Sequence, residues 1–373
     1  MPGYYEFFAG GGMVRAGLGP GWDCLLANDI EAAKGRAYQA NWGADEFVLR
    51  DIASLQPGDL PGRADLAWGS FPCQDLSLAG PGAGLAGARS GTFYAFWRLM
   101  RGLIAEGRGP RLIALENVCG ALTSHGGSDF AAIAETFAAA NYRLGALIID
   151  AALFRPQSRP RLFLIGADAR LAIGPALRAS GPCEPFHPAA LVRATQALPG
   201  HLWWRLPAPP PRWLTLADVI EDPPAGDWHA PDQTARLLTL MSPVNLAKVE
   251  AAKRRGERLI GTVYRRTRRD AAGARTQRAE ARFDSLAGCL RTPAGGSSRQ
   301  LILAVEGKTV RSRLISARET ARLMGLGDDY RLPANYNEAY RLTGDGVVAD
   351  VVRHLAAHLF EPLLATQAVS AAA

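Results

Sequence analysis

A cysteine set directly after a proline is the first candidate for chemistry in this sequence. Cys73 lies in the segment 69–77, GSFPCQDLS, which follows the end of an expected buried strand at 66–68. Pro72 fixes φ and has no backbone donor, so neither sheet nor helix continues regularly through it. Cys73 is therefore expected on a stiff turn at the carboxyl end of a strand, where open α/β sheets place their chemistry. Because most single cysteines are small buried hydrophobes, the neighbouring elements must decide its role.

The loop that follows Cys73 is rich in glycine. Residues 80–87 have the sequence GPGAGLAG, which is too Gly-rich to be rigid by itself. We expect this loop to close over a bound molecule.

The N-terminal segment combines a strand, a glycine turn and a helix. Residues 4–8 (YYEFF) predict a buried strand, 9–12 (AGGG) a tight turn, and 13–18 the start of a helix. This arrangement allows the backbone to approach a nucleotide-like ligand. Asp29 follows the second strand, at a position where ribose hydroxyls are bound in Rossmann-like sites, and Asp51 follows the third, where it can accept from an adenine amino group. Either aspartate can equally be a helix N-cap.

Further along the chain, one acid and two arginines stand beside predicted strands. Glu116 ends the strand at 111–115, on the same sheet edge as Cys73, while Arg159 and Arg161 alternate on an extended segment and can face one way. Helices predicted at 31–41, 92–104 and 130–140 alternate with the strands, which continue at 142–149 and 161–167. The fold class is therefore α/β, with a mostly parallel sheet covered by helices on both faces.

Composition limits the possible classes of protein. The 373 residues are 48% hydrophobic and 21% charged, which indicates a globular chain with a large core. The net charge of +7 and the pI of about 9.4 favour a polyanionic partner. The five cysteines form no CxxC pair or disulfide framework, so we expect no metal and a reducing, cytoplasmic environment. No apolar run is long enough for a membrane span. A signal peptide would need a continuous apolar segment near the N-terminus, and Glu6 interrupts the first apolar run.

The pattern changes near residue 180, where proline-rich stretches replace the alternation of strands and helices. Residues 253–278 contain ten Lys or Arg and only two acids. Within them, 262–269 (TVYRRTRR) interleaves strand formers with arginines, as expected for contacts to phosphates and base edges. A solvated charged surface is the alternative. Residues 294–300 form a polar Gly loop that can follow a nucleic-acid backbone.

Three C-terminal segments have recognisable patterns. Residues 313–326 predict a helix with a capping box of Ser316 and Glu319, which we interpret as structural. Residues 342–348 predict a turn that opens the last helix, 349–359. The tail from 364 to 373 is expected to be disordered.

Taken together, these segments resemble the DNA cytosine-C5 methyltransferases over nearly the full chain. The matching motifs occur in the family's order: FAGGG at 8–12, PCQ at 72–74, ENV at 116–118, QxRxR at 157–161, the helix from 313 to 319, and GDGV at 344–347. The resemblance implies a Rossmann-like, S-adenosylmethionine-dependent methyltransferase domain and a smaller, irregular target-recognition domain, with DNA in the cleft between them. It divides the chain into a catalytic domain at 1–185, a recognition domain at 186–305 and a return segment at 306–363.

The resemblance also implies a mechanism in which Cys73 attacks C6 of a cytosine flipped out of the duplex. C5 then takes the methyl group of S-adenosyl-L-methionine, and loss of the C5 proton with β-elimination releases Cys73. By similarity, Glu116 holds N3 and the exocyclic amine, Arg161 binds the O2 side, and Arg159 lies near the thiolate or the base. The cysteine needs a lowered pKa, to which nearby arginines contribute.

Binding residues follow from the same resemblance. The implied cofactor-binding residues are Phe8, Ala9, Gly10, Gly12, Asp29, Ile30, Asp51, Ile52, Pro72, Asp345 and Val347. The DNA-binding candidates are Gln74, Ser77, Arg89, Arg265, Arg266, Arg268, Arg291, Ser297 and Ser298.

Two departures from the family pattern stand out. Asp345 occupies a position where many relatives have Asn in the last turn, which alters the charge near the cofactor. Cys289-Leu290 replaces a common Thr-aliphatic pair in the recognition region.

Several alternatives remain open at this point. A tRNA methyltransferase of the same fold shares the nucleophile motif, although the arginine-rich insert favours duplex DNA. A non-catalytic DNA-binding relative would be expected to have lost one of the four catalytic residues. An NAD-dependent oxidoreductase is disfavoured because GGG replaces GxGxxG, and N4 or N6 methylation because no Asn/Asp/Ser-Pro-Pro-aromatic motif is present.

The expected partner is double-stranded DNA, in the cytoplasm and at the nucleoid of a prokaryote or phage-infected cell. We expect a monomer, since one flipped base needs one active site. A cognate restriction endonuclease is a further expected partner.

Overall fold

The computed structural model describes residues 1–72, 91–196, 198, 200–224, 226–269, 273–291 and 299–370. The chain divides into two compact units. Unit 1 comprises Met1–Asp150, Pro160–Pro210 and Val347–Ala373, and unit 2 comprises Ala151–Arg159 and Pro211–Gly346. These limits differ from the domain limits expected from the sequence, and the recognition role of the second unit stays a prediction.

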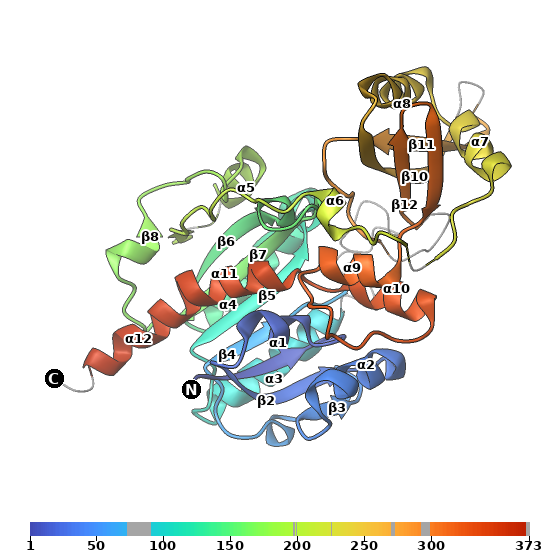
Figure 1. The fold of residues 1–373 in the computed structure, drawn as a ribbon. Coiled ribbons are helices and arrows are strands. Elements are labelled where there is room, and N and C mark those ends of the chain that lie inside the picture. The colour runs from blue at the N-terminus through green and yellow to red at the C-terminus, as the bar shows by residue number, and fades with distance from the viewer. Residues whose placement is uncertain are drawn as a thin grey trace. The chain divides into compact units, whose positions relative to one another are not determined.

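Unit 1 is built on a seven-stranded sheet in the order β3-β2-β1-β4-β5-β7-β6 (Figure 1). Its strands are β1 Gly3–Phe7, β2 Asp23–Asp29, β3 Phe47–Leu49, β4 Leu66–Gly69, β5 Leu112–Val118, β6 Tyr142–Asp150 and β7 Pro160–Asp168. The first five strands in this order, β3, β2, β1, β4 and β5, pair in parallel. Strand β7 runs antiparallel to its neighbours β5 and β6. Because parallel strands end at the same edge, the residues after β1, β2, β4 and β5 come close to one another.

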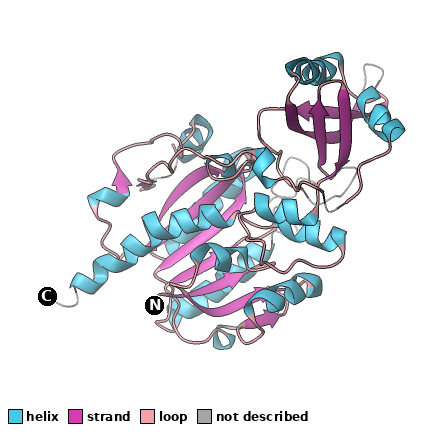
Figure 2. Ribbon diagram, in the orientation of Figure 1, coloured by secondary structure: helices cyan, strands magenta, loops and turns pink. Residues whose placement is uncertain are grey.

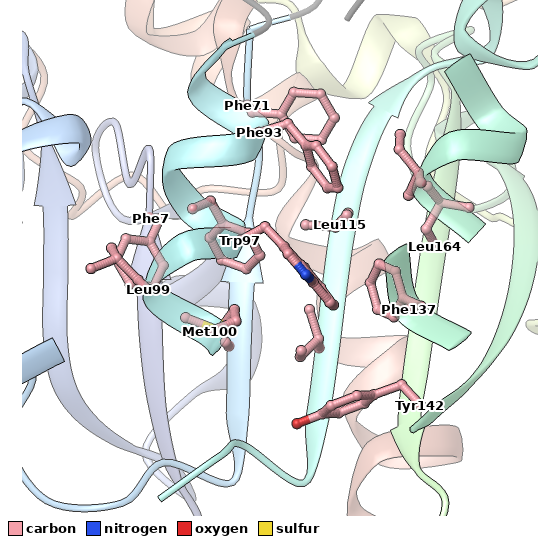
Figure 3. Close-up of a cluster of buried hydrophobic side chains, with 14 of the residues drawn as sticks. Phe7, Phe71, Phe93, Trp97, Leu99, Met100, Leu115, Phe137, Tyr142 and Leu164 are labelled. Atoms are coloured by element: carbon pink, nitrogen blue, oxygen red, sulfur yellow. The ribbon is translucent and has the colours of Figure 1, made fainter. Parts of the chain in front are cut away.

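Helices α3 (Gly91–Ala105) and α4 (Ser128–Ala139) cover one face of this sheet. The strands contribute Phe7, Leu115 and Leu164 to a buried core, and the helices contribute Phe96 and Phe137. Figure 3 shows the labelled aromatic side chains of this cluster packed between helix and strands. The helical spacing of the apolar residues in α3 explains why its whole inner face is buried.

The opposite face carries α1 (Met13–Leu18), α2 (Ala32–Trp42) and the C-terminal helix. That helix runs through α11 (Ala349–Leu355), a π-helical turn (Ala356–Phe360) and α12 (Glu361–Ser370). Phe360 makes edge contacts with Trp22 and Trp68. A disordered tail was expected from residue 364, whereas Leu363 and Leu364 are buried and α12 extends to Ser370.

Short elements complete unit 1. They are the 3-10 turns Ile52–Ser54, Pro57–Asp59, Cys119–Leu122, Ser124–Gly127 and Pro175–Leu177, the strands β8 (Arg178–Ala179) and β9 (Trp203–Trp204), and helix α5 (Ala189–Thr195).

Unit 2 contains a four-stranded antiparallel sheet in the order β11-β10-β12-β13. Figure 2 shows its strands in magenta and the helices of the unit in cyan. The strands are β10 Arg258–Arg269, β11 Arg275–Arg282, β12 Leu301–Glu306 and β13 Thr309–Leu314. Helices α6 (Leu216–Val219), α7 (Pro231–Thr239), α8 (Pro243–Arg255), α9 (Ala317–Leu323) and α10 (Tyr336–Asp345) belong to the same unit, together with the 3-10 turn Ala151–Leu153. Its small core joins Leu237 and Val249 of the helices to Val263, Ala281 and Leu303 of the strands.

Two predicted C-terminal elements need correction. The capping box of Ser316 and Glu319 is present, but α9 begins only at Ala317, and Arg313 lies in β13. There its buried guanidinium forms an ion pair with the Glu319 carboxylate. The predicted turn at 342–348 also differs, because α10 continues through Asp345 and the chain leaves the helix only at Gly346.

Candidate active site

The glycine loop after β1 is held in a fixed conformation by its neighbours. Phe8, Gly10 and Gly12 all have positive φ (59°, 57° and 77°), which the loop needs for its sharp reversal. A Cβ on Gly12 would lie 2.3 Å from Trp42 Nε1, whereas a Cβ on Gly10 would meet no atom within 4 Å. The loop is therefore tightly packed on one side and has open space at Gly10, which fits the approach of a ligand to the backbone.

Asp29, at the end of β2, ties this loop to the next connection. Its carboxylate accepts hydrogen bonds from the backbone N–H of Gly10 and of Glu31, both at 2.8 Å, and the residue is 6% exposed. Ala9 is buried beside it. Each carboxylate oxygen keeps a second lone pair, so the predicted contact with ribose hydroxyls fits this geometry.

The other predicted cofactor residues on this side occupy different environments. Asp51 caps the turn Ile52–Ser54 by accepting from the Ala53 N–H at 2.9 Å, which is the capping alternative considered from the sequence. Ile30, next to Asp29, exposes 63% of its surface, and Ile52 is buried in the core. Ile30 thus offers an apolar surface for a ligand, whereas Ile52 packs in the core of unit 1.

Glu116 and Arg161 form an ion pair on neighbouring strands. Arg161 of β7 lies opposite Val118 of β5, which places it diagonally across from Glu116. The Arg161 Nε lies 3.1 Å from Glu116 Oε1, and the side chains are 15% and 8% exposed. The guanidinium therefore fixes the orientation of the carboxylate before any ligand binds.

Asn117 is a positioning residue that sequence reasoning did not assign. Its side chain accepts from the Val118 N–H at 2.8 Å and donates weakly to the Phe71 carbonyl at 3.4 Å. Phe71 is the residue directly before Pro72. Asn117 therefore connects the end of β5 to the segment that leads into Pro72 and Cys73. Its place in the ENV tripeptide was the sequence feature that could have identified this role.

Cys73 itself lies outside the described residues, as do the DNA-binding candidates Gln74, Ser77 and Arg89 and the Gly-rich loop 80–87. Pro72 is exposed at the border of the described chain. Two other cysteines are poor nucleophiles, because burial raises the pKa of Cys24 and of Cys119, even though Arg161 partly opposes the shift at Cys119.

Arg159 has different partners from Arg161. It is 2% exposed, and its guanidinium donates to the carbonyls of Leu290, Gly344 and Gly346 at 3.0, 2.9 and 2.6 Å. It also approaches Cys289 Sγ at 3.3 Å. The two arginines were expected to face one way, but β7 begins only at Pro160, so Arg159 belongs to unit 2 and joins segments there.

Gln157 strengthens the same connections. Its amide donates to the Leu323 carbonyl at 2.9 Å and accepts from the Leu290 N–H at 3.2 Å, and the residue is fully buried. Gln157 and Arg159 together hold three separate segments of unit 2.

The last predicted cofactor residues flank the end of α10. Asp345 is its final residue, 3.7 Å from Arg341, and Val347 is buried in unit 1. Among the recognition candidates, Arg265 and Arg266 lie on β10, Arg268 has only its backbone described, and Arg291 is exposed. Ser297 and Ser298 lie outside the described residues.

One buried acid was not predicted to matter. Glu6 of β1 is fully buried, and burial raises its pKa to about 8, although the backbone N–H groups of Val14 and Arg15 in α1 oppose the shift. In the sequence it only interrupted an apolar run.

Two negative findings apply to the described ranges. No three His, Cys, Asp or Glu side chains there lie close enough to hold a metal ion. No helix among these residues has both the length and the apolar character needed to cross a bilayer.

The sheet and its edge define the class of protein. The structure is similar to that of the S. pombe Dnmt2 methyltransferase, with a TM-score of 0.61 and 17% identity over 97% of this chain and 99% of that chain. This likeness establishes the methyltransferase fold, with its mostly parallel central sheet.

Sequence comparison identifies the family. The model described as C-5 cytosine-specific DNA methylase matches residues 4–361, so the chain belongs to this family and is a DNA cytosine-C5 methyltransferase. It is 25% identical to the Type II methyltransferase M.NlaX of Neisseria lactamica, over 94% of each chain. It is 23% identical to the Type II methyltransferase M1.ScrFI of Lactococcus lactis subsp. cremoris, over 96% of this chain and 78% of that protein. The predicted family, fold class and enzyme class are confirmed.

Proposed function

We propose that the chain methylates C5 of cytosine within a short, specific site of duplex DNA, with Cys73 as the nucleophile. The observation that carries this proposal is the Glu116–Arg161 pair on β5 and β7. It lies beside β4, the strand that leads into Pro72 and Cys73. The position of β5 next to β4 supports the assignment of a nucleophile and a base-binding carboxylate to one sheet edge.

Each side chain has a role in this reaction. The Cys73 thiolate adds to C6, and Glu116 stabilises the charge that develops on the ring through N3 and the exocyclic amine. Arg161 orients Glu116 and binds the O2 side of the base. After methylation, loss of the C5 proton allows the C6–S bond to break and releases Cys73. Arg159, with its backbone acceptors, acts as a positioning residue.

The proposed methyl donor is S-adenosyl-L-methionine, which supplies an electrophilic methyl group. Its proposed contacts are the backbone of Gly10, the carboxylates of Asp29 and Asp51, and the side chain of Ile30. Phe8, Ala9, Gly12, Pro72 and Val347 shape the surroundings, and Asp345 brings a charge to the methionine end. The free space at Gly10 and the two backbone donors already bound by Asp29 support this assignment.

The proposed partners follow from the relatives. Both reported relatives are Type II methyltransferases, which supports a partnership with a cognate restriction endonuclease. We propose a monomer as the acting species.

Base-resolution conversion sequencing tests the function directly. An unmethylated plasmid is incubated with the protein and S-adenosylmethionine, and cytosines of one short motif are expected to become fully protected. A Cys73→Ser variant that binds the cofactor should protect none. Protection of no site by a folded, cofactor-binding protein would contradict the proposal, and a parallel reaction with tRNA would show whether RNA is the substrate.

A further inference from the structure

Asn28 is a buried polar residue of unit 1 that has no role in the mechanism proposed above. It stands in β2 directly before Asp29 and is 1% exposed. Its side-chain nitrogen donates to the backbone carbonyls of Val48 and Arg50, at 2.9 and 2.8 Å. Both bonds cross from β2 to the end of β3, its neighbour in the sheet (Figure 1). An asparagine amide has two N–H donors, so these two carbonyls use both of them.

The backbone at Asn28 is bound to the glycine loop as well. The Asn28 carbonyl accepts from the Ala9 N–H at 2.9 Å. The carboxylate of the next residue, Asp29, accepts from the Gly10 N–H at 2.8 Å. The end of β2 is therefore tied to the loop at two successive residues, while the Asn28 side chain reaches the other way, to β3.

The peptide bond between Arg50 and Asp51 is fixed by the same end of β2. Arg50 donates its N–H to the Asp29 carbonyl at 3.1 Å, and its own carbonyl accepts from the Asn28 amide. Because the peptide group is planar, a bound carbonyl also fixes the direction in which the next residue begins. The Asn28 side chain therefore controls where Asp51 stands relative to Asp29.

Asp51 is exposed, so its position depends on its backbone. Its Oδ1 accepts from the Ala53 N–H at 2.9 Å. This cap is local, within two residues, and does not connect Asp51 to β2. The bond from Asn28 to the Arg50 carbonyl supplies that connection. Oδ2 is the oxygen that we assign to the adenine amino group.

We propose that Asn28 is a positioning residue for the methyl donor, which acts through Asp51 and sets the affinity for the adenosine part of the cofactor. This inference rests on the proposed function, which assigns Asp29 and Asp51 to the cofactor. Without the Asn28 amide the Arg50 carbonyl loses its buried partner, and the peptide group that carries Asp51 is free to turn. The glycine loop and Asp29 keep their own hydrogen bonds, so the transfer step itself is expected to proceed at its normal rate.

A double-mutant cycle tests whether Asn28 acts through Asp51. Calorimetric titration with S-adenosylhomocysteine, the product that remains after methyl transfer, measures the affinity of the full-length wild type, Asn28→Ala, Asp51→Asn and the double variant. Asp51→Asn keeps an acceptor for the Ala53 N–H but removes the charged oxygen assigned to the adenine. Each single substitution is expected to weaken binding about 10-fold, because a hydrogen bond to a charged group contributes about that factor. The double variant should bind as weakly as Asp51→Asn and no more weakly.

Steady-state methylation gives a second readout, which a merely structural role would not move. In Asn28→Ala the KM for S-adenosylmethionine is expected to rise about 10-fold, by the same hydrogen-bond argument, while kcat and the KM for DNA stay at their wild-type values.

Asn41→Ala on α2 is the matched control for this substitution. Asn41 also donates its side-chain amide to a backbone carbonyl, that of Ala37 at 2.8 Å, and its variant should bind S-adenosylhomocysteine as the wild type does. Thermal unfolding shows which variants are folded. If Asn28→Ala is unfolded at the assay temperature, Asn28→Ser takes its place in the cycle, because its hydroxyl can donate to one of the two carbonyls.

The outcomes separate this inference from the proposed function. Losses that multiply in the double variant, or a wild-type affinity in a folded Asn28→Ala chain, overturn the role of Asn28 while cytosine methylation still stands. A fall in kcat with an unchanged KM for the cofactor overturns it as well. A wild-type chain that binds no S-adenosylhomocysteine and methylates no cytosine overturns the proposed function, and this inference with it.

Discussion

The sheet edge of unit 1 at Glu116 and the arginine-bearing strand pair β10–β11 of unit 2 use charge in opposite ways. At the edge, Glu116 and Arg161 are largely buried and paired, and Asp29 accepts two backbone hydrogen bonds. On the strand pair β10–β11, Arg278 is exposed and lies opposite Arg266. The edge is preorganised before any ligand binds, which suits chemistry that depends on fixed geometry. The strand pair β10–β11 keeps charged side chains accessible to solvent, which suits reversible binding.

The largest expected effect comes from breaking the paired edge. Glu116→Gln keeps the size of the side chain but removes the charge that Arg161 orients. We expect kcat to fall about 10²–10³-fold, or about 2.7–4 kcal/mol, because the developing charge on the base loses its stabiliser. Single-turnover methylation of the identified site measures this effect.

The matched control for this substitution is Glu135→Gln on α4, where Glu135 is exposed. Its kcat should equal that of the wild type. A Glu116→Gln enzyme that retains full kcat would show that the pair is only structural.

The sequence predicted the sheet well, because its strands are apolar runs bounded by glycine, proline and acids. The strand at 47–49 and the helix at 92–104 match β3 and α3 within a residue or two. The spacing of apolar residues in these segments depends only on which of their residues are buried, and it can be read directly from the sequence. Asp29 ends β2 as predicted, whereas β5 continues two residues past Glu116 to Val118.

The predictions that differ from the structure concern residues whose positions depend on contacts between segments far apart in the sequence. Arg313 was placed in a helix because its capping box is local, but its ion pair with Glu319 joins a strand to the following helix. Spacing alone placed Arg159 beside Arg161, yet carbonyls more than a hundred residues away bind Arg159. The arginines that lie opposite each other on β10 and β11 could be identified only from the register of the two strands, which composition does not give. Long-range partners decide such cases, and a single sequence does not specify them.

The second prediction sharpens the contrast through pH, because strand β1 of unit 1 also contains a fully buried acid, Glu6. The pKa of Glu6 is raised to about 8 by burial, so the folded state binds its proton where the unfolded state has released it. Stability is therefore expected to fall as pH rises from about 4.5 to about 8, by an amount on the order of a few kcal/mol. Glu6→Gln removes this dependence.

Urea unfolding of both proteins at about pH 5 and about pH 9 checks this prediction, since most of the expected fall in stability lies between these two values. The stabilising effect of Glu6→Gln should be larger at the higher pH. Glu135→Gln should show no such difference, and an effect of Glu6→Gln that is equal at both pH values would contradict the prediction.

The smallest expected effect concerns the strand pair β10–β11 in the free protein. Arg278→Gln removes a charge that faces Arg266 directly across the strand pair. The free energy of unfolding of the free protein is expected to rise by about 0.2–1 kcal/mol, because the repulsion between opposed like charges disappears. At about 1 M salt the Debye length is about 3 Å, so the gain should vanish there. Urea unfolding at low and high salt measures it, with Arg254→Gln on α8 as the control. A gain that persists at high salt would show that charge repulsion is not its cause. A loss of stability at low salt would show that Arg278 stabilises the free protein.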